Sequence, residues 1–228
     1  SHVGYLPENP YFYDYLSGRE FLEFCGELFS LPAQVRRERV CELLRVVGLE
    51  DAADVHLRKY SKGMLQRIGI ARALANDPDL VLLDEPMTGL DPIGRLEVKR
   101  LIQRLHDEGK TVLFNSHIMA DVEEMCERIA LISDGKLLLW GDLAEIRRER
   151  GVKCVQVQAA GIPDELRDYR KKELPGNVIE YEIGDGRTPE RIFHSYAASG
   201  IPVDRFERVL PSLTDIFIEE VSRARRGA

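Results

Sequence analysis

The spacing of apolar residues predicts that the first third of the chain is helical. Apolar side chains recur at helical intervals after residues 17–20, which read Ser-Gly-Arg-Glu and have the pattern of a capping box. Further helices are predicted over about 33–47 and from about 61 to the Asp-Pro pair at 77–78. We therefore expect a helical subdomain over about residues 16–77.

After residue 78 the helical spacing of apolar residues gives way to short continuous apolar runs. The runs at 80–83 and 111–114 predict strands buried on both faces, and 128–133 predicts a third strand. Helices over about 92–107 and 119–126 are predicted between them. This alternation of strands and helices is typical of a parallel α/β sheet. The Asp-Gly pair that follows predicts a hairpin turn into one more strand.

The last third of the chain predicts a second, smaller α+β domain. Its apolar pattern predicts strands over about 152–157, 178–183 and 203–210 and helices over about 189–199 and 212–221. We place the boundary near residue 150, in the charged stretch 147–151. The expected domains are therefore residues 1–150 and 151–228.

Composition narrows the class of protein. The 228 residues are 44% hydrophobic and carry a formal net charge of −7, which favours a folded chain and argues against nucleic-acid binding by bulk charge. No apolar run approaches the roughly 18 residues that span a bilayer, and the first residues lack the pattern of a secretory signal. Four scattered cysteines without a C-x-x-C pair fit a reducing compartment. We expect a cytosolic protein with no nucleic-acid partner.

Two adjacent carboxylates at the end of a predicted strand are the strongest chemical feature. Asp84 and Glu85 follow the apolar run 80–83, and the carboxyl ends of parallel strands form the ligand-binding edge of α/β sheets. Asp84 is placed to hold Mg²⁺ through its water shell, and Glu85 to orient or deprotonate an attacking water. The alternative is an ordinary strand end whose acidic residues cap the next helix.

Two further segments have residues that suit a phosphate. Ser61, Lys62 and Gly63 lie at a predicted helix N-terminus, where a hydroxyl and free N–H groups favour an anion, although Ser61 taken alone is more often a plain N-cap than a ligand. His117 follows the predicted strand 111–114 directly and is placed to reach a γ-phosphate. A single histidine is otherwise structural by default.

Together these residues resemble the nucleotide-binding domain of ABC-type ATPases, over about residues 2–148. Residues 60–64 are similar to the family's LSGGQ signature, 80–85 to its Walker B strand and catalytic glutamate, and 89–91 to its D-loop, which includes Asp91. His117 falls on the family's switch histidine. The resemblance implies ATP and Mg²⁺ as cofactors and the P-loop NTPase fold, a parallel sheet with a helical signature subdomain.

The sequence departs from the family at the signature and at a further motif, the Q-loop. Residues 60–64 read Tyr-Ser-Lys-Gly-Met, so that Ser61 and Gly63 remain while Lys62 adds a cation that would face the γ-phosphate or solvent. The glutamine of the family's Q-loop is replaced by Glu8. By resemblance, Glu8 would contact both the nucleotide site and the metal.

A P-loop is missing from the sequence. The motif needs G-x-x-x-x-G-K-[ST] between a strand and a helix. The Gly-Lys-Thr at 109–111 has Arg104 in place of the first glycine and leads from a helix into a strand. We expect the P-loop to lie upstream, in a longer cassette of which this chain is a fragment that is inactive alone.

The C-terminal part resembles the extra domain of ATPase subunits from drug and antibiotic exporters. Residues 210–217 carry this resemblance, and the aromatic-rich segment 9–16 is typical of the same subfamily. The resemblance implies a second ATPase subunit in a head-to-tail dimer, permease partners, and a peripheral location on the inner face of the membrane.

Three functions follow from these observations. The leading prediction is the ATP-hydrolysing subunit of an ABC exporter. An ABC ATPase of DNA repair or translation is the alternative, against which stand the absence of a sustained heptad run and the single signature motif. The third is an interaction module that dimerises or docks without hydrolysis.

Overall fold

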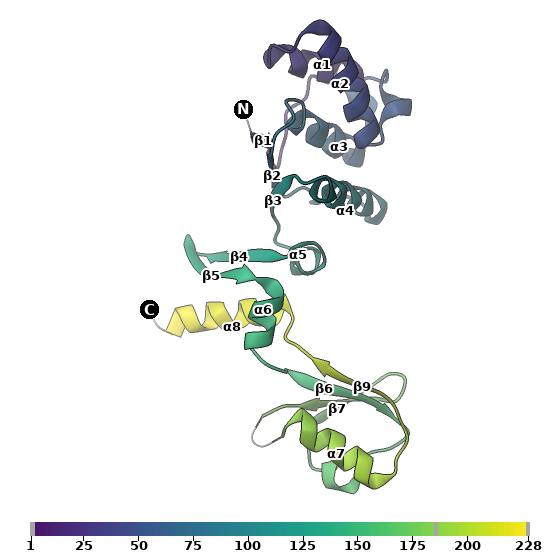
Figure 1. Ribbon diagram of the computed structural model, residues 1–228, viewed down its shortest axis with the longest axis vertical. Coiled ribbons are helices and arrows are strands. Elements are labelled where there is room, and N and C mark those ends of the chain that lie inside the picture. The colour runs from purple at the N-terminus through teal and green to yellow at the C-terminus, as the bar shows by residue number, and fades with distance from the viewer. Residues whose placement is uncertain (1–2, 185–186, 227–228) are drawn as a thin grey trace. The chain divides into compact units, whose positions relative to one another are not determined.

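The computed structural model describes residues 3–184 and 187–226 (Figure 1). The chain forms two compact units, Ser1–Ile118 and Met119–Ala228. The boundary predicted near residue 150 falls inside the second unit, between α6 (Leu143–Glu149) and β6 (Cys154–Ala159). That boundary stays a prediction.

The first unit is built on a parallel three-stranded sheet. Its strands β1 (Val3–Leu6), β2 (Leu80–Asp84) and β3 (Thr111–Asn115) lie in that order, with β2 in the centre. The register pairs Leu6 with Leu83 and Asp84 with Asn115, so the carboxyl ends of all three strands share one edge. The predicted α/β fold with a parallel sheet is confirmed.

Helices follow the predicted pattern closely. They are α1 (Gly18–Leu28), α2 (Ala33–Val46), α3 (Lys62–Ala73) and α4 (Pro92–Asp107), with short 3-10 turns η1 (Glu50–Ala52) and η2 (Leu57–Lys59). The capping box before α1 forms in both directions, since the Glu20 N–H donates to Ser17 Oγ and the Ser17 N–H to Glu20 Oε2 (2.8 Å).

Close packing joins the sheet to α3. Leu6 and Val81 of the sheet and Ile68 and Ile70 of α3 are fully buried. At Gly4 of β1, a Cβ atom would collide with the carbonyl oxygen of Ala73, the last residue of α3. Glycine is therefore required for β1 to approach this helix end.

Two predictions about strands were wrong. The strand predicted at 128–133 does not join the parallel sheet: β4 (Arg128–Ser133) pairs antiparallel with β5 (Lys136–Asp142), because the two-residue turn between them folds the chain straight back. The strand predicted at 111–114 is not buried on both faces. It forms the edge strand β3, whose Leu113 is 63% exposed.

The first part of the second unit contains the β4–β5 hairpin, which packs against helices. These are α5 (Met119–Met125), α6 and α8 (Leu213–Arg226). Apolar residues from the hairpin and the helices form one cluster, which contains Ile129, Leu131, Leu143, Ile146, Leu213 and Ile216.

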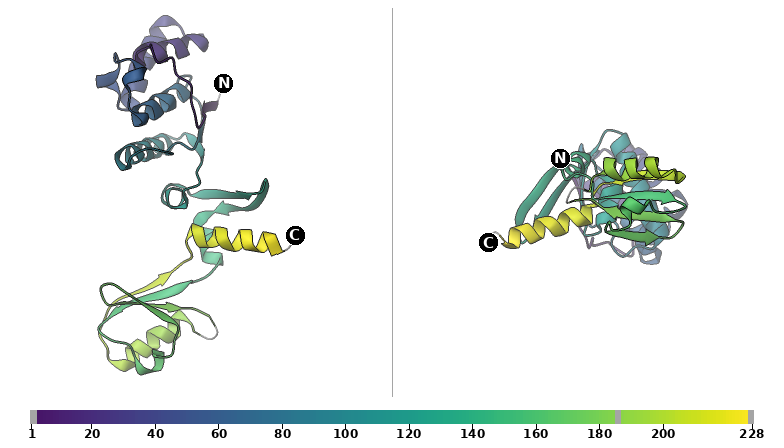
Figure 2. Two further views of the ribbon diagram at one scale, coloured as in Figure 1. Left: turned by 180° about the vertical axis from the view of Figure 1, so that it is seen from behind. Right: turned by 90° about the horizontal axis from the view of Figure 1, so that it is seen from below.

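The rest of the second unit is an antiparallel four-stranded sheet of order β7-β8-β6-β9. Its other strands are β7 (Lys171–Leu174), β8 (Val178–Glu182) and β9 (Val203–Val209), with a 3-10 turn η3 (Asp164–Leu166) after β6. Helix α7 (Pro189–Ser199) lies across one face of this sheet (Figure 2). The core between them includes Tyr181 and Tyr196, whose hydroxyls are 2.8 Å apart.

Candidate functional site

The end of β2 places the two adjacent carboxylates in a fixed hydrogen-bond network. Asn115, the last residue of β3, lies directly opposite Asp84. Its Nδ2 donates to Asp84 Oδ1 (2.7 Å), and its Oδ1 accepts from the backbone N–H of Glu85 (2.7 Å). Glu85 has a φ of +47°, which a residue with a side chain adopts only when its surroundings impose it. One asparagine therefore holds both acidic residues.

Both carboxylate oxygens of Glu85 are oriented by neighbours. Oε1 accepts from the His117 backbone N–H (3.1 Å) and lies 2.9 Å from His117 Nδ1, and Oε2 accepts from Thr88 Oγ1 (2.7 Å). Because an ionised carboxylate only accepts hydrogen bonds, Nδ1 of His117 carries a proton and Nε2 is its outer nitrogen. The Glu85 side chain is 17% exposed and that of His117 69%. In the Glu85–His117 pair, the carboxylate is therefore half-buried and the imidazole ring is exposed.

A second group of predicted residues lies where two helices begin. Ser61 caps α3 by accepting from the Met64 N–H (3.2 Å), and Asp91 caps α4 by accepting from the Gly94 N–H (2.7 Å). A Cβ atom on Gly63 would lie 3.8 Å from the Gly94 Cα, so the two helix N-termini are neighbours. Two helix dipoles therefore point their positive ends into the same region.

Lys62 and Tyr60 have different surroundings. The exposed Lys62 extends its Nζ against Gly89 (φ +69°), where any Cβ would collide with it. The Tyr60 hydroxyl donates to the Ala52 carbonyl oxygen (2.7 Å), and burial raises the pKa of this phenol. Lys62 thus lies beside Gly89, while Tyr60 ties the start of α3 to the 3-10 turn η1.

Glu8 is exposed in the bend after β1. Since β1 and β2 run in parallel and Leu6 pairs with Leu83, Glu8 follows the sheet at the same edge as Asp84 and Glu85. Among the described residues, no three His, Cys, Asp or Glu side chains converge as a metal site. The donor set, Asp84 with Glu8 on the same edge, fits Mg²⁺, which keeps most of its waters and takes one or two carboxylates.

The structure brings the predicted residues together in two groups. Asp84, Glu85 and His117 form the first, and Ser61, Lys62, Gly63 and Asp91 lie around the N-termini of α3 and α4. Sequence reasoning did not assign roles to Asn115 and Thr88, which orient Glu85. Their signals were their positions: an amide at the end of a strand adjacent to β2, and a hydroxyl three residues after the glutamate.

Comparison with known proteins gives the family. The model of the family "ABC transporter" matches residues 1–88, and "ATP-binding protein DrrA1-3-like, C-terminal domain" matches residues 141–221. A fluoroquinolones export ATP-binding protein of Mycobacterium tuberculosis is 33% identical over 222 residues, which are 97% of this chain and 68% of that protein. The chain belongs to the ABC transporter ATP-binding proteins.

Further comparisons agree with this assignment. An uncharacterised ABC transporter ATP-binding protein of Nostoc is 53% identical over 68% of this chain, although the match spans only 47% of that protein. The chain thus spans about half the length of this curated relative. A solved ATP-binding subunit of an ABC transporter matches 66% of this chain and 62% of its own, with a TM-score of 0.56 and 30% identity. Within the described residues, every helix is too short or too polar to cross a membrane.

Proposed function

We propose that this chain is part of an ATP-hydrolysing subunit that powers an ABC exporter. The observation that carries the proposal is Glu85, held at the carboxyl edge of the sheet with its φ positive and both oxygens oriented. Strained, well-fixed carboxylates at this edge are characteristic of ligand and reaction sites. Bound MgATP supplies the phosphoryl group and a cation that neutralises its charge.

The proposed roles follow from the hydrogen bonds. The Glu85 carboxylate accepts the proton of an attacking water, while Thr88 and His117 fix its orientation. The exposed ring of His117 donates from Nε2 to a phosphate oxygen when the ring is a cation. Asp84, fixed by Asn115, and Glu8 accept hydrogen bonds from the water shell of Mg²⁺.

The N-termini of α3 and α4 are proposed to bind the phosphates of a nucleotide held by a second subunit. Ser61 and Gly63 provide a hydroxyl and backbone N–H groups, Lys62 adds a positive charge, and Asp91 fixes the start of α4. The arrangement supports a head-to-tail dimer in which each subunit completes the site of the other.

Two kinds of observation support export, permease partners and a peripheral membrane location. They are the similarity to exporter subunits and the exposed aromatic residues near the N-terminus. The DrrA1-3-like C-terminal domain and the relative named for fluoroquinolone export favour an exporter. Tyr11 and Tyr15 are 79% and 64% exposed, whereas Tyr13 packs edge-on against Phe24 with 5.4 Å between ring centroids. We assign Tyr11 and Tyr15 to permease docking and Tyr13 to the helical subdomain.

Subunit mixing tests the proposal in a longer subunit that carries a P-loop. Ser61→Arg blocks the surface offered to the partner, and Glu85→Gln removes the base. Mixed dimers then contain one site with both lesions and one with neither. We expect the mixture to regain ATPase activity that neither variant has alone.

Thr188→Arg is the matched control for Ser61→Arg. Thr188 caps α7 in the second unit as Ser61 caps α3, by accepting from the Arg191 N–H. This variant should keep full activity alone and in any mixture. A mixture of the Ser61 and Glu85 variants that stays as inactive as each component would refute the proposed trans arrangement.

A further inference from the structure

The four-stranded sheet of the second unit ends in β9. Among the described residues β9 pairs only with β6, which leaves its other side as an open edge. Alternate N–H and C=O groups of an edge strand point away from the sheet and offer hydrogen bonds to another strand. Natural edges are defended by charges and bulges, and β9 has both, with a bulge beyond Arg205.

The charges of β9 are ordered so that they match their own antiparallel copy. The strand reads Asp204-Arg205-Phe206-Glu207-Arg208. If two copies pair antiparallel with Phe206 opposite Phe206, Arg205 lies opposite Glu207. By two-fold symmetry this opposite-charge pair occurs twice. Arg205, Phe206 and Glu207 lie in the regular part of the strand, opposite Gln158, Val157 and Gln156 of β6.

The neighbouring registers are unfavourable or lack two-fold symmetry. A shift by one residue in either direction pairs no residue with its own copy and so breaks the two-fold symmetry, and in one direction it also sets Arg205 opposite Arg208. A shift by two sets Arg205 opposite its own copy, or Glu207 opposite its own. Like charges directly opposite each other destabilise a sheet, so the charge order specifies one register.

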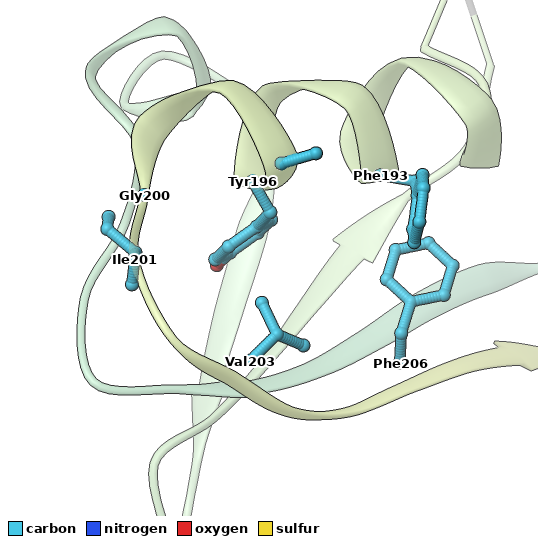
Figure 3. Close-up of a pocket in the computed structure, with 7 residues that line it drawn as sticks. Phe193, Tyr196, Gly200, Ile201, Val203 and Phe206 are labelled. Atoms are coloured by element: carbon cyan, nitrogen blue, oxygen red, sulfur yellow. The ribbon is translucent and has the colours of Figure 1, made fainter.

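Apolar side chains lie along the same edge. Phe206 and Phe193 pack edge-on with ring centroids 5.4 Å apart, and Phe193 of α7 is 53% exposed. These rings line an open pocket of about 280 Å³ between α7 and β9, together with Val203, which is 39% exposed (Figure 3). Phe206 lies opposite the fully buried Val157, so it points to the face that α7 covers. Two-fold pairing of β9 would set a second α7 on that same face and bring the two apolar pockets together.

We infer that β9 is a dimerisation edge whose partner is β9 of a second copy of this chain. The two sheets join into one antiparallel sheet of eight strands, with Phe206 on the two-fold axis. At present Arg205 pairs with Glu207 along the strand. Both side chains are at least 44% exposed, so exchanging these partners for those of the second copy requires no change in the core. This contact is separate from the nucleotide-dependent dimer proposed above.

Charge reversal tests the inference by sedimentation velocity on the 228-residue chain without nucleotide. Glu207→Arg sets arginine opposite Arg205 twice, and Arg205→Glu sets glutamate opposite Glu207 twice. We expect each variant to raise the dissociation constant of the dimer by about tenfold or more. An equimolar mixture of the two variants restores opposite charges at both positions, and it should dimerise as the wild type does. The double variant Arg205→Glu/Glu207→Arg should also dimerise.

Glu173→Arg is the matched control, because it makes the same substitution at an exposed position of β7, the opposite edge of the sheet. It should leave the dimer intact, and circular dichroism should show unchanged folding in every variant. A wild-type chain that stays monomeric at about 100 µM, well above typical weak-dimer constants, would overturn the inference. So would a dimer that Glu207→Arg leaves unaffected, or a mixture of the two single variants that stays monomeric.

Discussion

Glu85 in the first unit and Asp215 in the second are both carboxylates fixed by several donors, yet their surroundings differ. Asp215 Oδ2 accepts from the backbone N–H (2.9 Å) and hydroxyl (2.7 Å) of Ser212 and from Lys153 Nζ (2.8 Å). The Asp215 N–H donates back to Ser212 Oγ, so the two residues form a reciprocal cap at the start of α8. The hydrogen bonds between Asp215 and Ser212 therefore cap the N-terminus of α8.

The hydrogen bonds that Glu85 accepts do not cap a helix. They come from a histidine beyond the neighbouring strand and from a threonine in the following turn, and the backbone of Glu85 is strained. Strain of this kind opposes folding by about 1–3 kcal/mol. The comparison teaches that the number of hydrogen bonds does not single out Glu85. Positive φ alone does not either, because Asp77 has a φ of +49° and also accepts from two cations, Arg39 and Lys110. The proposed role of Glu85 rests on its place at the carboxyl edge of the sheet and on donors that cap no helix.

The largest expected effect that tests this comparison is on turnover. In a longer subunit with a P-loop, Glu85→Gln keeps the side-chain shape but removes the base, so the ATPase rate should fall by roughly 10²–10⁴-fold while nucleotide binding remains. Asp215→Asn, an equally small change, should leave the rate unchanged. Equal losses in both variants would contradict the distinction between the two carboxylates.

A smaller effect is expected at Asn115, which holds Glu85 and Asp84 together. Asn115→Asp removes the donor to Asp84 Oδ1 and sets a carboxylate against it, so turnover should fall by about 10–100-fold, as for one lost charge-assisted hydrogen bond. Gln103→Glu is the control, because Gln103 Nε2 also donates to an aspartate, Asp107, but within α4. That variant should retain the wild-type rate.

Much of the fold was predictable because the local signals were consistent. The capping box at 17–20, the Pro92 helix start and the Asp-Gly hairpin turn each formed as the sequence indicated. Strand pairing was harder to predict, because a short apolar run does not reveal its neighbours. Residues 128–133 therefore joined a hairpin in place of the parallel sheet, and β1, α6 and β7, each only four to seven residues long, were not predicted.

The residue types of the candidate site could be selected from the sequence, but their contacts could not. Asp84, Glu85 and His117 could be selected because they follow apolar strands. Their partners could not, since the bond between Asn115 and Glu85 depends on the register of two strands 30 residues apart in sequence. The strain at Glu85 likewise arises from tertiary structure.

A third test uses pH and concerns the cap of α8. Bonds from Lys153 and Ser212 lower the pKa of Asp215 to about 2, below its ordinary value of 3.8. Because its pKa is lower in the folded state than in the unfolded state, the ionised Asp215 carboxylate stabilises the fold above pH about 4. This stabilisation is lost as the pH falls toward about 2. Because the Asp215 side chain is 36% exposed, solvent screens its interactions, and we expect its charge to contribute about 1 kcal/mol to the free energy of unfolding.

Asp215→Asn should therefore lower the free energy of unfolding by about 1 kcal/mol at neutral pH and by progressively less below pH about 4. Urea unfolding followed by the fluorescence of Trp140, the single tryptophan, reports on the second unit. Asp168→Asn, at an exposed position of the same unit, is the control. A difference between wild type and Asp215→Asn that persists at pH about 2 would show that the cap acts through shape and not through charge.

The smallest effect is expected at Glu8, which shares the sheet edge with Asp84 and Glu85 but is exposed. As a carboxylate it adds negative charge near the proposed cation, so it should tighten Mg²⁺ binding through the water shell. Glu8→Gln keeps an oxygen at the same reach and should be tolerated, with a Mg²⁺ requirement raised by no more than about threefold, the effect of one screened surface charge. Glu8→Ala removes the oxygen and should lower the ATPase rate at every Mg²⁺ concentration. The measurement is ATPase rate against Mg²⁺ for wild type and both variants in a longer subunit with a P-loop. If Glu8→Ala follows the wild-type curve, Glu8 is an exposed loop residue, and Asp84 alone provides the carboxylate for the metal.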